Sequence, residues 1–349
     1  MNYVHGGDIY TLRQAFEGPV LDFSANVNPL GMPPGVRRAA KLAVNEAVHY
    51  PDPLCRELKR AVAEHEGVRS GQVVCGNGAA DLIFRLVLAK RPKKAVLPVP
   101  CFAEYEAALN TVDCEMAYET LSEEKGFALT EGFLTRLGPE TDMVFLCDPN
   151  NPTGKTVEPS LLDAVVRHCE ARGILLVLDR CFGDFLDSPP EKGCAFPSNV
   201  FVLKAFTKLY AMAGLRLGYG LCGDPALLER MEGACQPWSV STPAQAAGVA
   251  ALKETAYVER SRRLIRIERA FLINELEARG MKVYGSEANS VFFRAQSQTL
   301  MEQLKAQGIL IRSCGNYRGL DTRYYRIAVR THDENRQLIS AMDKLKGGN

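Results

Sequence analysis

Short apolar runs alternate with longer amphipathic segments along the first two thirds of the chain. Runs rich in Val, Leu, Ile and Cys are typical of buried β-strands, and they lie at 72–75, 95–98, 143–147, 174–178, 200–204 and 218–222. Helical patterns lie between several of these runs, at 79–89, 159–171 and 225–234. Strands that alternate with helices predict an α/β fold, a mostly parallel sheet flanked by helices on both faces.

The pattern changes in the last third of the chain. Residues 243–280 predict one or two long helices with a charged face. Beyond them, a helix pattern at 298–307 lies among short strand patterns, which fall at 283–284, 290–294, 309–312 and 325–330. We interpret this part as a smaller α+β C-terminal domain, completed by part of the N-terminal segment. The predicted organisation is an N-terminal segment at 1–30, a large domain at 31–240 and a small domain at 241–349.

Composition narrows the classes of function. The 349 residues are 46% hydrophobic, enough for two domains with their own cores, and 42 basic against 41 acidic residues leave a net charge of +1. We therefore expect no nucleic-acid or membrane partner. Eleven cysteines without a C-x-x-C pair speak against a metal site or a disulfide framework and for a reducing, cytoplasmic compartment. The first residues lack the features of a signal peptide, and no apolar run is long enough to span a membrane.

The stretch 205–219, AFTKLYAMAGLRLGY, is the strongest pointer to chemistry. Lys208 follows Thr207 directly and precedes Arg216 by eight positions. An amine can hold an aldehyde cofactor covalently, while a hydroxyl and a guanidinium suit a phosphate on the same cofactor. A single lysine is most often a solvated surface charge. Here apolar neighbours would desolvate the amine and lower its pKa, which favours the cofactor site.

Other polar positions follow the predicted strands in the order that such a site requires. A glycine loop at 76–80 opens a helix, whose first N–H groups can bind phosphate. Phe102 could cover an aromatic ring, and Asn151 in an Asn-Pro-Thr-Gly turn could donate to a ring oxygen. Asp179 follows a strand and could keep a pyridine nitrogen protonated. Each position alone fits a turn, a cap or a core, but their joint order at strand ends favours the site.

These motifs resemble the pyridoxal-phosphate enzymes of fold type I, in the branch of the histidinol-phosphate aminotransferases. Further stretches are similar to the threonine-phosphate decarboxylases of cobalamin biosynthesis. They are HGG at 5–7, DFSANVNPLG at 22–31, YPD at 50–52, IRSCGNY at 311–317 and GLDTRYYR at 319–326. The resemblance spans essentially the whole chain and implies an aspartate-aminotransferase-like large domain and the cofactor pyridoxal 5'-phosphate.

The resemblance also implies roles for individual residues. Lys208 would form the Schiff base and Asp179 would bind the ring nitrogen, so that both are catalytic. The other cofactor-binding residues would be Gly78, Ala79, Ala80, Phe102, Asn151, Thr207 and Arg216. Tyr50 would reach the cofactor phosphate of a neighbouring subunit, which implies a homodimer with shared active sites. The substrate would contact His5, Asn26, Asn151, Arg312, Arg323 and Arg326.

Several positions depart from the family pattern. Ala205 stands where relatives usually carry a serine, and Ala79 and Ala80 replace more polar residues of the phosphate loop. Binding of the cofactor phosphate would therefore depend more on basic and hydroxyl side chains and on backbone N–H groups. Phe182 replaces a tyrosine of many aminotransferases. Nothing in the sequence explains the Arg-Cys pair at 180–181, where Glu-Ala is common.

Two reactions fit the same cofactor site, because the bond that stands perpendicular to the cofactor ring is the one that breaks. The expected reaction is decarboxylation of O-phospho-L-threonine to (R)-1-aminopropan-2-yl phosphate, which the stretches 5–7 and 313–317 favour. The alternatives are an aminotransferase of the histidinol-phosphate type, in which Arg326 holds the carboxylate, and a decarboxylase that prefers O-phospho-L-serine. A non-catalytic regulator is disfavoured because Lys208 and Asp179 are both present.

Overall fold

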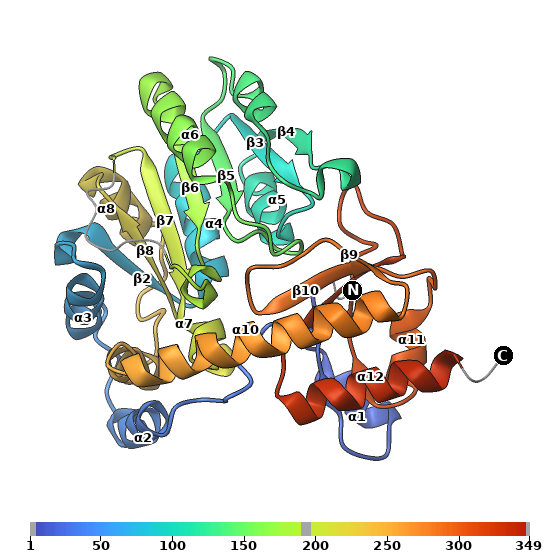
Figure 1. Cartoon of the computed structure of the whole chain (residues 1–349). Coiled ribbons are helices and arrows are strands. Elements are labelled where there is room, and N and C mark those ends of the chain that lie inside the picture. The colour runs from blue at the N-terminus through green and yellow to red at the C-terminus, as the bar shows by residue number, and fades with distance from the viewer. Residues whose placement is uncertain (1–4, 190–196, 347–349) are drawn as a thin grey trace.

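A seven-stranded sheet forms the centre of the molecule (Figure 1). The structure, a computed structural model, describes residues 5–189 and 197–346. The strands are, in sheet order, β2 (Val73–Gly76), β8 (Gly218–Cys222), β7 (Val200–Ala205), β6 (Leu175–Asp179), β5 (Met143–Cys147), β3 (Lys94–Val99) and β4 (Glu115–Thr120). Strand β8 runs antiparallel to both neighbours and the remaining pairs are parallel. The predicted α/β fold class is therefore confirmed.

The hydrophobic pattern located the inner strands because helices cover both of their faces. Every residue of β5, β6, β7 and β8 is buried, and the strands are mainly apolar, with Asp179 at the end of β6 and Lys204 within β7 as the charged exceptions. The sequence analysis missed β4, one of the two edge strands, whose residues are exposed or half-buried. Its sequence, EMAYET, mixes polar and apolar residues, as a solvent-facing edge permits.

Helices pack on both faces of this sheet. On one face, α4 (Ala79–Lys90), α5 (Ala103–Asn110) and α8 (Pro225–Gly233) bury apolar side chains against β3, β5 and β7. A second, larger core contains side chains of α3 (Arg56–Glu66), α6 (Pro159–Arg172), α9 (Thr242–Ala251) and α10 (Thr255–Ala278). Helix α2 (Pro34–Ala43) packs on α9. The pattern at 243–280 thus forms two helices, α9 and α10.

The last third of the chain forms a separate antiparallel sheet. Its strands are, in order, β12 (Arg312–Ser313), β13 (Tyr324–Ala328), β10 (Ser290–Arg294) and β9 (Lys282–Val283). Helices α11 (Leu300–Lys305) and α12 (His332–Lys346) belong to the same region, and the sequence analysis missed α12. The predicted strand at 309–312 is two short strands in different sheets, since β11 (Ile309–Leu310) pairs elsewhere.

The N-terminal segment contacts this C-terminal region through a pair of strands. Strand β1 (Leu21–Asp22) pairs in parallel with β11, after helix α1 (Ile9–Ala15). Residues 1–4 of the segment lie outside the described residues, and the predicted domain boundaries at 30 and 240 stay predictions. The chain therefore brings Leu21 and Asp22 beside a strand that comes 288 positions later.

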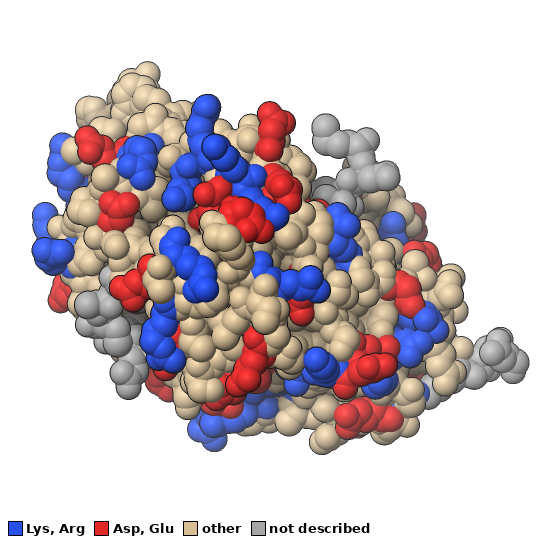
Figure 2. Space-filling model, turned by 90° about the horizontal axis from the view of Figure 1, so that it is seen from above, with Lys and Arg blue, Asp and Glu red and all other residues tan. Residues whose placement is uncertain are grey.

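Three further features of the structure are its surface charge, its lack of a membrane-spanning helix in the described ranges and its cysteines. Basic and acidic side chains are interspersed over the face that Figure 2 shows. Within the described ranges, no helix has both the length and the apolar composition to cross a membrane. The ten cysteines in those ranges are all unpaired, and Cys194 lies outside them.

Candidate active site

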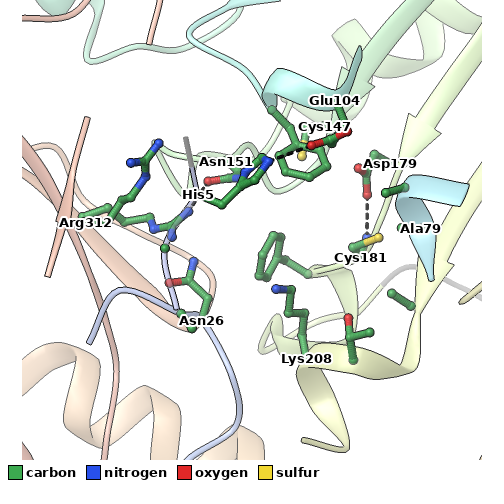
Figure 3. A pocket seen from close by; sticks show the side chains of 18 of the residues that line it. His5, Asn26, Ala79, Glu104, Cys147, Asn151, Asp179, Cys181, Lys208 and Arg312 are labelled. Atoms are coloured by element: carbon green, nitrogen blue, oxygen red, sulfur yellow. Dashed lines mark hydrogen bonds and ion pairs between the residues drawn. The ribbon is translucent and has the colours of Figure 1, made fainter. Parts of the chain in front are cut away.

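A cavity of about 350 Å³ lies between the carboxyl ends of the large sheet, the N-terminal segment and the antiparallel sheet (Figure 3). We call it the central cavity. It is lined by most of the predicted site residues, namely His5, Asn26, Ala79, Ala80, Phe102, Asn151, Asp179, Thr207, Lys208, Arg216, Arg312 and Arg326. Residues 321 positions apart in the sequence therefore face one space.

Lys208 lies on the short helix α7 (Phe206–Leu209), directly after β7. Burial, followed by the nearby charge of Arg326, lowers the pKa of Lys208 to about 8. The amine is 5.9 Å from the centre of the Phe182 ring. A lysine with such a pKa is partly unprotonated near neutral pH, which is the state that attacks an aldehyde.

Asp179 ends strand β6 and is held by two hydrogen bonds. The Tyr105 hydroxyl on α5 donates to Oδ2 at 2.6 Å, and the Cys181 N–H donates to Oδ1 at 3.0 Å. Burial, and next the charge of Asp179, raise the pKa of Tyr105, so its hydroxyl stays a donor. The Tyr105 ring stacks on Phe145 with centres 4.6 Å apart. The carboxylate is therefore anchored in the core while Asp179 lines the central cavity.

A phosphate-sized cradle lies at the start of α4. Gly78 has a φ of +87°, and a Cβ there would lie 2.7 Å from Arg216 Nη2. A Cβ at Gly218 would lie 2.9 Å from the backbone nitrogen of Ala79. The two glycines thus let Arg216 and strand β8 approach the helix terminus closely, with Thr207 beside them in the cavity lining. Unpaired N–H groups, a guanidinium and a hydroxyl are the groups that bind phosphate.

Arg326 on β13 connects three parts of the molecule. Its Nη1 donates to Asn151 Oδ1, and its Nη2 donates to the Ser24 carbonyl oxygen at 2.7 Å. Among the described residues, the buried Arg326 Nε and the buried Asn26 Oδ1 have no hydrogen-bond partner. Such groups are costly unless something pairs with them. A ligand with both acceptors and donors, as an amino acid has, would satisfy them.

A second group of polar residues lies at the other end of the central cavity. Arg312 on β12 donates to Asn316 Oδ1 at 2.9 Å, and its guanidinium is 5.3 Å from the centre of the Tyr317 ring. His5 Nε2 is 2.7 Å from Glu104 Oε1. Figure 3 shows His5 and Arg312 approaching the cavity from the side opposite Asp179. The cavity therefore carries basic groups at both ends.

Three predicted site residues lie outside the cavity lining. Gly78 is not part of the lining, but its lack of a side chain lets the Arg216 guanidinium approach the start of α4. Tyr50 is 78% exposed and stacks on Trp238, with ring centres 4.4 Å apart. Arg323 does not reach the cavity and instead pairs with Asp321 at 2.5 Å. The structure thus does not bring Arg323 to the other predicted substrate residues.

The unexplained pair at 180–181 now has a structural account. The guanidinium of Arg180 is 3.7 Å from Asp148 Oδ2, and Asp148 also accepts from the Val157 N–H at 3.0 Å. Arg180 therefore helps to hold the loop that carries Asn151. Cys181 lines the cavity beside Asp179, and burial raises the pKa of its thiol, so the thiol stays protonated.

Sequence reasoning missed Tyr105, Glu104 and Ser24. Tyr105 has the appearance of a core aromatic and Glu104 that of an acidic residue in the first turn of a helix. Ser24 lies inside the stretch 22–31 on which the resemblance was based, so that stretch could have singled it out. The roles of the first two depend on partners far away in the sequence, which no local pattern indicates.

The whole chain is similar in sequence and fold to known proteins. The family model of aminotransferase class I and II matches residues 18–342. The threonine-phosphate decarboxylase of Salmonella typhimurium is 39% identical over 99% of this chain and 98% of its own. The crystal structure of the histidinol-phosphate aminotransferase from Clostridium acetobutylicum has a TM-score of 0.87 and 27% identity, covering 95% of this chain and all of that one.

A third comparison concerns the cofactor. The histidinol-phosphate aminotransferase from Sinorhizobium meliloti, solved in complex with pyridoxal 5'-phosphate, has a TM-score of 0.86 and 22% identity, covering 97% of this chain and 94% of that one. At 22% identity, this similarity shows a shared fold and nothing more. Matched over nearly its whole length by the family model, the chain belongs to the aminotransferase class I and II family.

Proposed function

We propose that the protein is a pyridoxal-phosphate-dependent decarboxylase that converts O-phospho-L-threonine to (R)-1-aminopropan-2-yl phosphate for cobalamin biosynthesis. One observation carries the proposal: His5 and Arg312 line the same cavity as Lys208 and Asp179. A cofactor site that also has basic groups at a distance from the cofactor cradle suits a substrate with its own phosphate. The 39% identity to the Salmonella decarboxylase supports the choice of reaction.

The residues present fit pyridoxal phosphate. Lys208 would hold it covalently, Asp179 would pair with the ring nitrogen, and Asn151 with the ring oxygen. Its phosphate would occupy the cradle of Arg216, Thr207 and the backbone at 78–80. When bound, the cofactor supplies an electron sink for the bond that breaks at the substrate Cα.

The chain's own residues set the orientation of the substrate. Arg312 and His5 would anchor its phosphate, and Asn26 and Arg326 offer the buried atoms that an amino acid can satisfy. Because the nitrogens Nη1 and Nη2 of Arg326 already donate to Asn151 and Ser24, a substrate anchored by its phosphate at Arg312 and His5 would leave its carboxylate only weakly held and able to depart as carbon dioxide. Lys208, with a pKa of about 8, can return a proton to Cα after carbon dioxide has left.

Transamination is the second candidate. The buried, unpaired Nε of Arg326 would bind the substrate carboxylate and hold it in place, and the similarity to the Clostridium aminotransferase agrees with this. With the carboxylate held, Lys208 would take the proton from Cα instead. A decarboxylase preferring O-phospho-L-serine remains an alternative within the first reaction, since one methyl group changes binding by only about 1–3 kcal/mol.

Product analysis of the holoenzyme distinguishes these reactions. With O-phospho-L-threonine alone, we expect carbon dioxide and aminopropanol phosphate in equal amounts, with no keto acid required. Turnover that stops unless 2-oxoglutarate is added would overturn the decarboxylase and support the aminotransferase. Faster turnover of O-phospho-L-serine would redirect the substrate assignment.

We also propose a cytoplasmic homodimer with shared active sites. Tyr50 and Trp238 form an exposed stacked pair, and Leu42, Val44 and Val48 are exposed nearby in the sequence. Exposed large apolar side chains are common at protein interfaces. Ten unpaired cysteines support a reducing compartment. Sedimentation at the mass of one chain, or full activity of a Tyr50→Ala variant, would contradict the shared site.

A further inference from the structure

The N-terminal segment is docked on Ser24 through two glycines. A Cβ at Gly6 would lie 2.3 Å from the carbonyl oxygen of Ser24, a backbone atom that cannot move aside. Gly7 has a φ of +93°, and its N–H donates to Ser24 Oγ at 2.6 Å. Residues with side chains would not fit this path. The two glycines therefore place His5, the residue before them, at the central cavity.

His5 is then held from the opposite wall of the cavity. Its Nε2 is 2.7 Å from Oε1 of Glu104, which lies in the first turn of α5 on the large sheet (Figure 3). The hydrogen bond from His5 is the main reason that the pKa of Glu104 is lowered. An ionised carboxylate can only accept, so the hydrogen bond requires a hydrogen on Nε2. Glu104 thus fixes the position of the imidazole.

A carboxylate at this place needs an explanation. Apart from Glu104 and Asp179, the charged side chains that line the central cavity are cationic, namely Lys208, Arg216, Arg312 and Arg326, and Asp179 is already held by Tyr105 and the Cys181 N–H. A negative charge beside them would by itself repel an incoming phosphate. Any benefit of Glu104 to an anionic ligand must therefore act through its partner. Holding a ring in place before the ligand arrives lowers the ordering cost of binding.

We propose that Glu104 is a positioning residue that orders His5 for the phosphate of the substrate, and so favours phosphorylated over unphosphorylated amino acids. The proposal rests on the proposed function in one respect, that the ligand carries a phosphate. It does not depend on whether the reaction is decarboxylation or transamination. It also accounts for the His-Gly-Gly stretch at 5–7, because the two glycines let the N-terminal segment pack on Ser24 and Glu104 holds His5 in place.

Substitution of Glu104 distinguishes a positioning role from a purely electrostatic one. Loss of positioning would weaken phosphate binding, whereas loss of a negative charge would strengthen it. In the holoenzyme, Glu104→Gln should raise both the KM for O-phospho-L-threonine and the dissociation constant of inorganic phosphate by about tenfold, the value of one charge-assisted hydrogen bond. kcat should change by less than about twofold. If Glu104 acts merely as a negative charge, both constants will fall, and the proposal is overturned.

Glu106 provides a matched control. It lies in the same first turn of α5 but pairs with Arg318 at 3.3 Å. Glu106→Gln removes the same charge and should leave both constants unchanged or slightly lower. Glu104→Asp keeps the charge on a shorter side chain and should still weaken phosphate binding. Phosphate binding by Glu104→Asp as weak as that of Glu104→Gln supports positioning, whereas wild-type binding by both overturns it.

A double-mutant cycle tests whether Glu104 acts through His5. If it does, His5→Ala and the double variant His5→Ala/Glu104→Gln will bind inorganic phosphate equally weakly. Additive losses would assign Glu104 an independent role and overturn the proposal. Calorimetric titration with phosphate needs no turnover, so it separates this inference from the choice of reaction. Absence of phosphate binding to the unmodified holoenzyme would overturn the proposed substrate class itself.

Discussion

Tyr105 on α5 donates a hydrogen bond of 2.6 Å to Asp179 at the end of β6. This bond ties the carboxylate that would pair with the cofactor ring to the hydrophobic core, since the Tyr105 ring stacks on Phe145. Tyr105 and Asp179 are almost fully buried, with exposed fractions of 1% and 5%. The orientation of a reactive group therefore depends on a side chain that does not line the central cavity.

Replacing Tyr105 by phenylalanine keeps the ring and removes the hydroxyl. We expect Tyr105→Phe to lower the free energy of unfolding by about 1–2 kcal/mol, because Asp179 Oδ2 loses a buried partner. Affinity for pyridoxal phosphate should fall several-fold as Asp179 becomes less well oriented. Chemical denaturation and cofactor titration measure the two effects. Tyr10→Phe, at an exposed residue, should change neither, and equal behaviour of the two variants would contradict the role of Tyr105.

Lys208 is expected to be indispensable for covalent cofactor binding. Lys208→Ala should lose turnover and the visible absorbance of bound pyridoxal phosphate together, and borohydride should no longer fix the cofactor to the chain. In the unsubstituted protein, cofactor binding should accelerate as the pH rises through about 8, since the amine loses its proton there. Stopped-flow absorbance across this range measures the rate. A variant that still turns over would refute the assignment.

Arg312 and Arg323 allow a paired test of phosphate binding. Arg312→Ala should raise the KM for phosphorylated substrates by about tenfold or more, because a charge-assisted contact in the cavity is lost. Arg323→Ala should have little effect, because Arg323 pairs with Asp321 outside the cavity. Steady-state kinetics of both variants decide the matter. A large effect of Arg323 alone would restore the role that the family resemblance implies for it.

Glu123 links the loop after β4 to the antiparallel sheet. It contacts Lys282 at 2.8 Å and accepts hydrogen bonds from Tyr284 and Tyr324. The Lys282 hydrogen bond, followed by those from the tyrosines, lowers the pKa of Glu123 to about 2. Because the group is partly exposed, Glu123→Gln should cost on the order of 1–2 kcal/mol of unfolding free energy at pH 7.

The pH dependence of this effect has a definite sign. The pKa of Glu123 is lower in the folded than in the unfolded protein, so its contribution is complete above the ordinary value of 4.5 and disappears as the pH falls toward about 2. The stability difference between the variant and the unsubstituted protein should therefore shrink between these pH values. Urea denaturation at pH 7 and pH 3 measures it. A difference that is constant with pH would exclude this carboxylate as its cause.

The sequence predicted the large sheet well because most of its strands are buried and mainly apolar. Asn151 and Asp179 were found for the same reason, since Asp179 ends strand β6, Asn151 lies in the loop after β5, and strand ends meet at one edge of a sheet. Strand β4 was missed because its residues are exposed or half-buried, unlike those of β2 at the other edge of the sheet, which are buried. Family resemblance then supplied His5 and Arg312, which no local pattern distinguishes.

The remaining site residues depend on tertiary partners. Glu104 gains its importance from a histidine 99 positions earlier, and Tyr105 from a carboxylate 74 positions later. For Arg323, a nearby residue decides instead. The family resemblance implies that Arg323 contacts the substrate, but it pairs with Asp321, two positions away, outside the central cavity. Secondary-structure patterns carry no information on either kind of pairing.

The pairing of β1 with β11 also affects how the enzyme is made. Lys208 and Arg216 leave the ribosome well before Arg326, which follows Arg216 by 110 residues. At roughly 5–20 residues per second, this interval is about 5–20 s. For most of it, until Ile309 and Leu310 have been made, β1 lacks its partner strand. The central cavity, which Arg312 and Arg326 help to line, can therefore be completed only after nearly the whole chain has been synthesised.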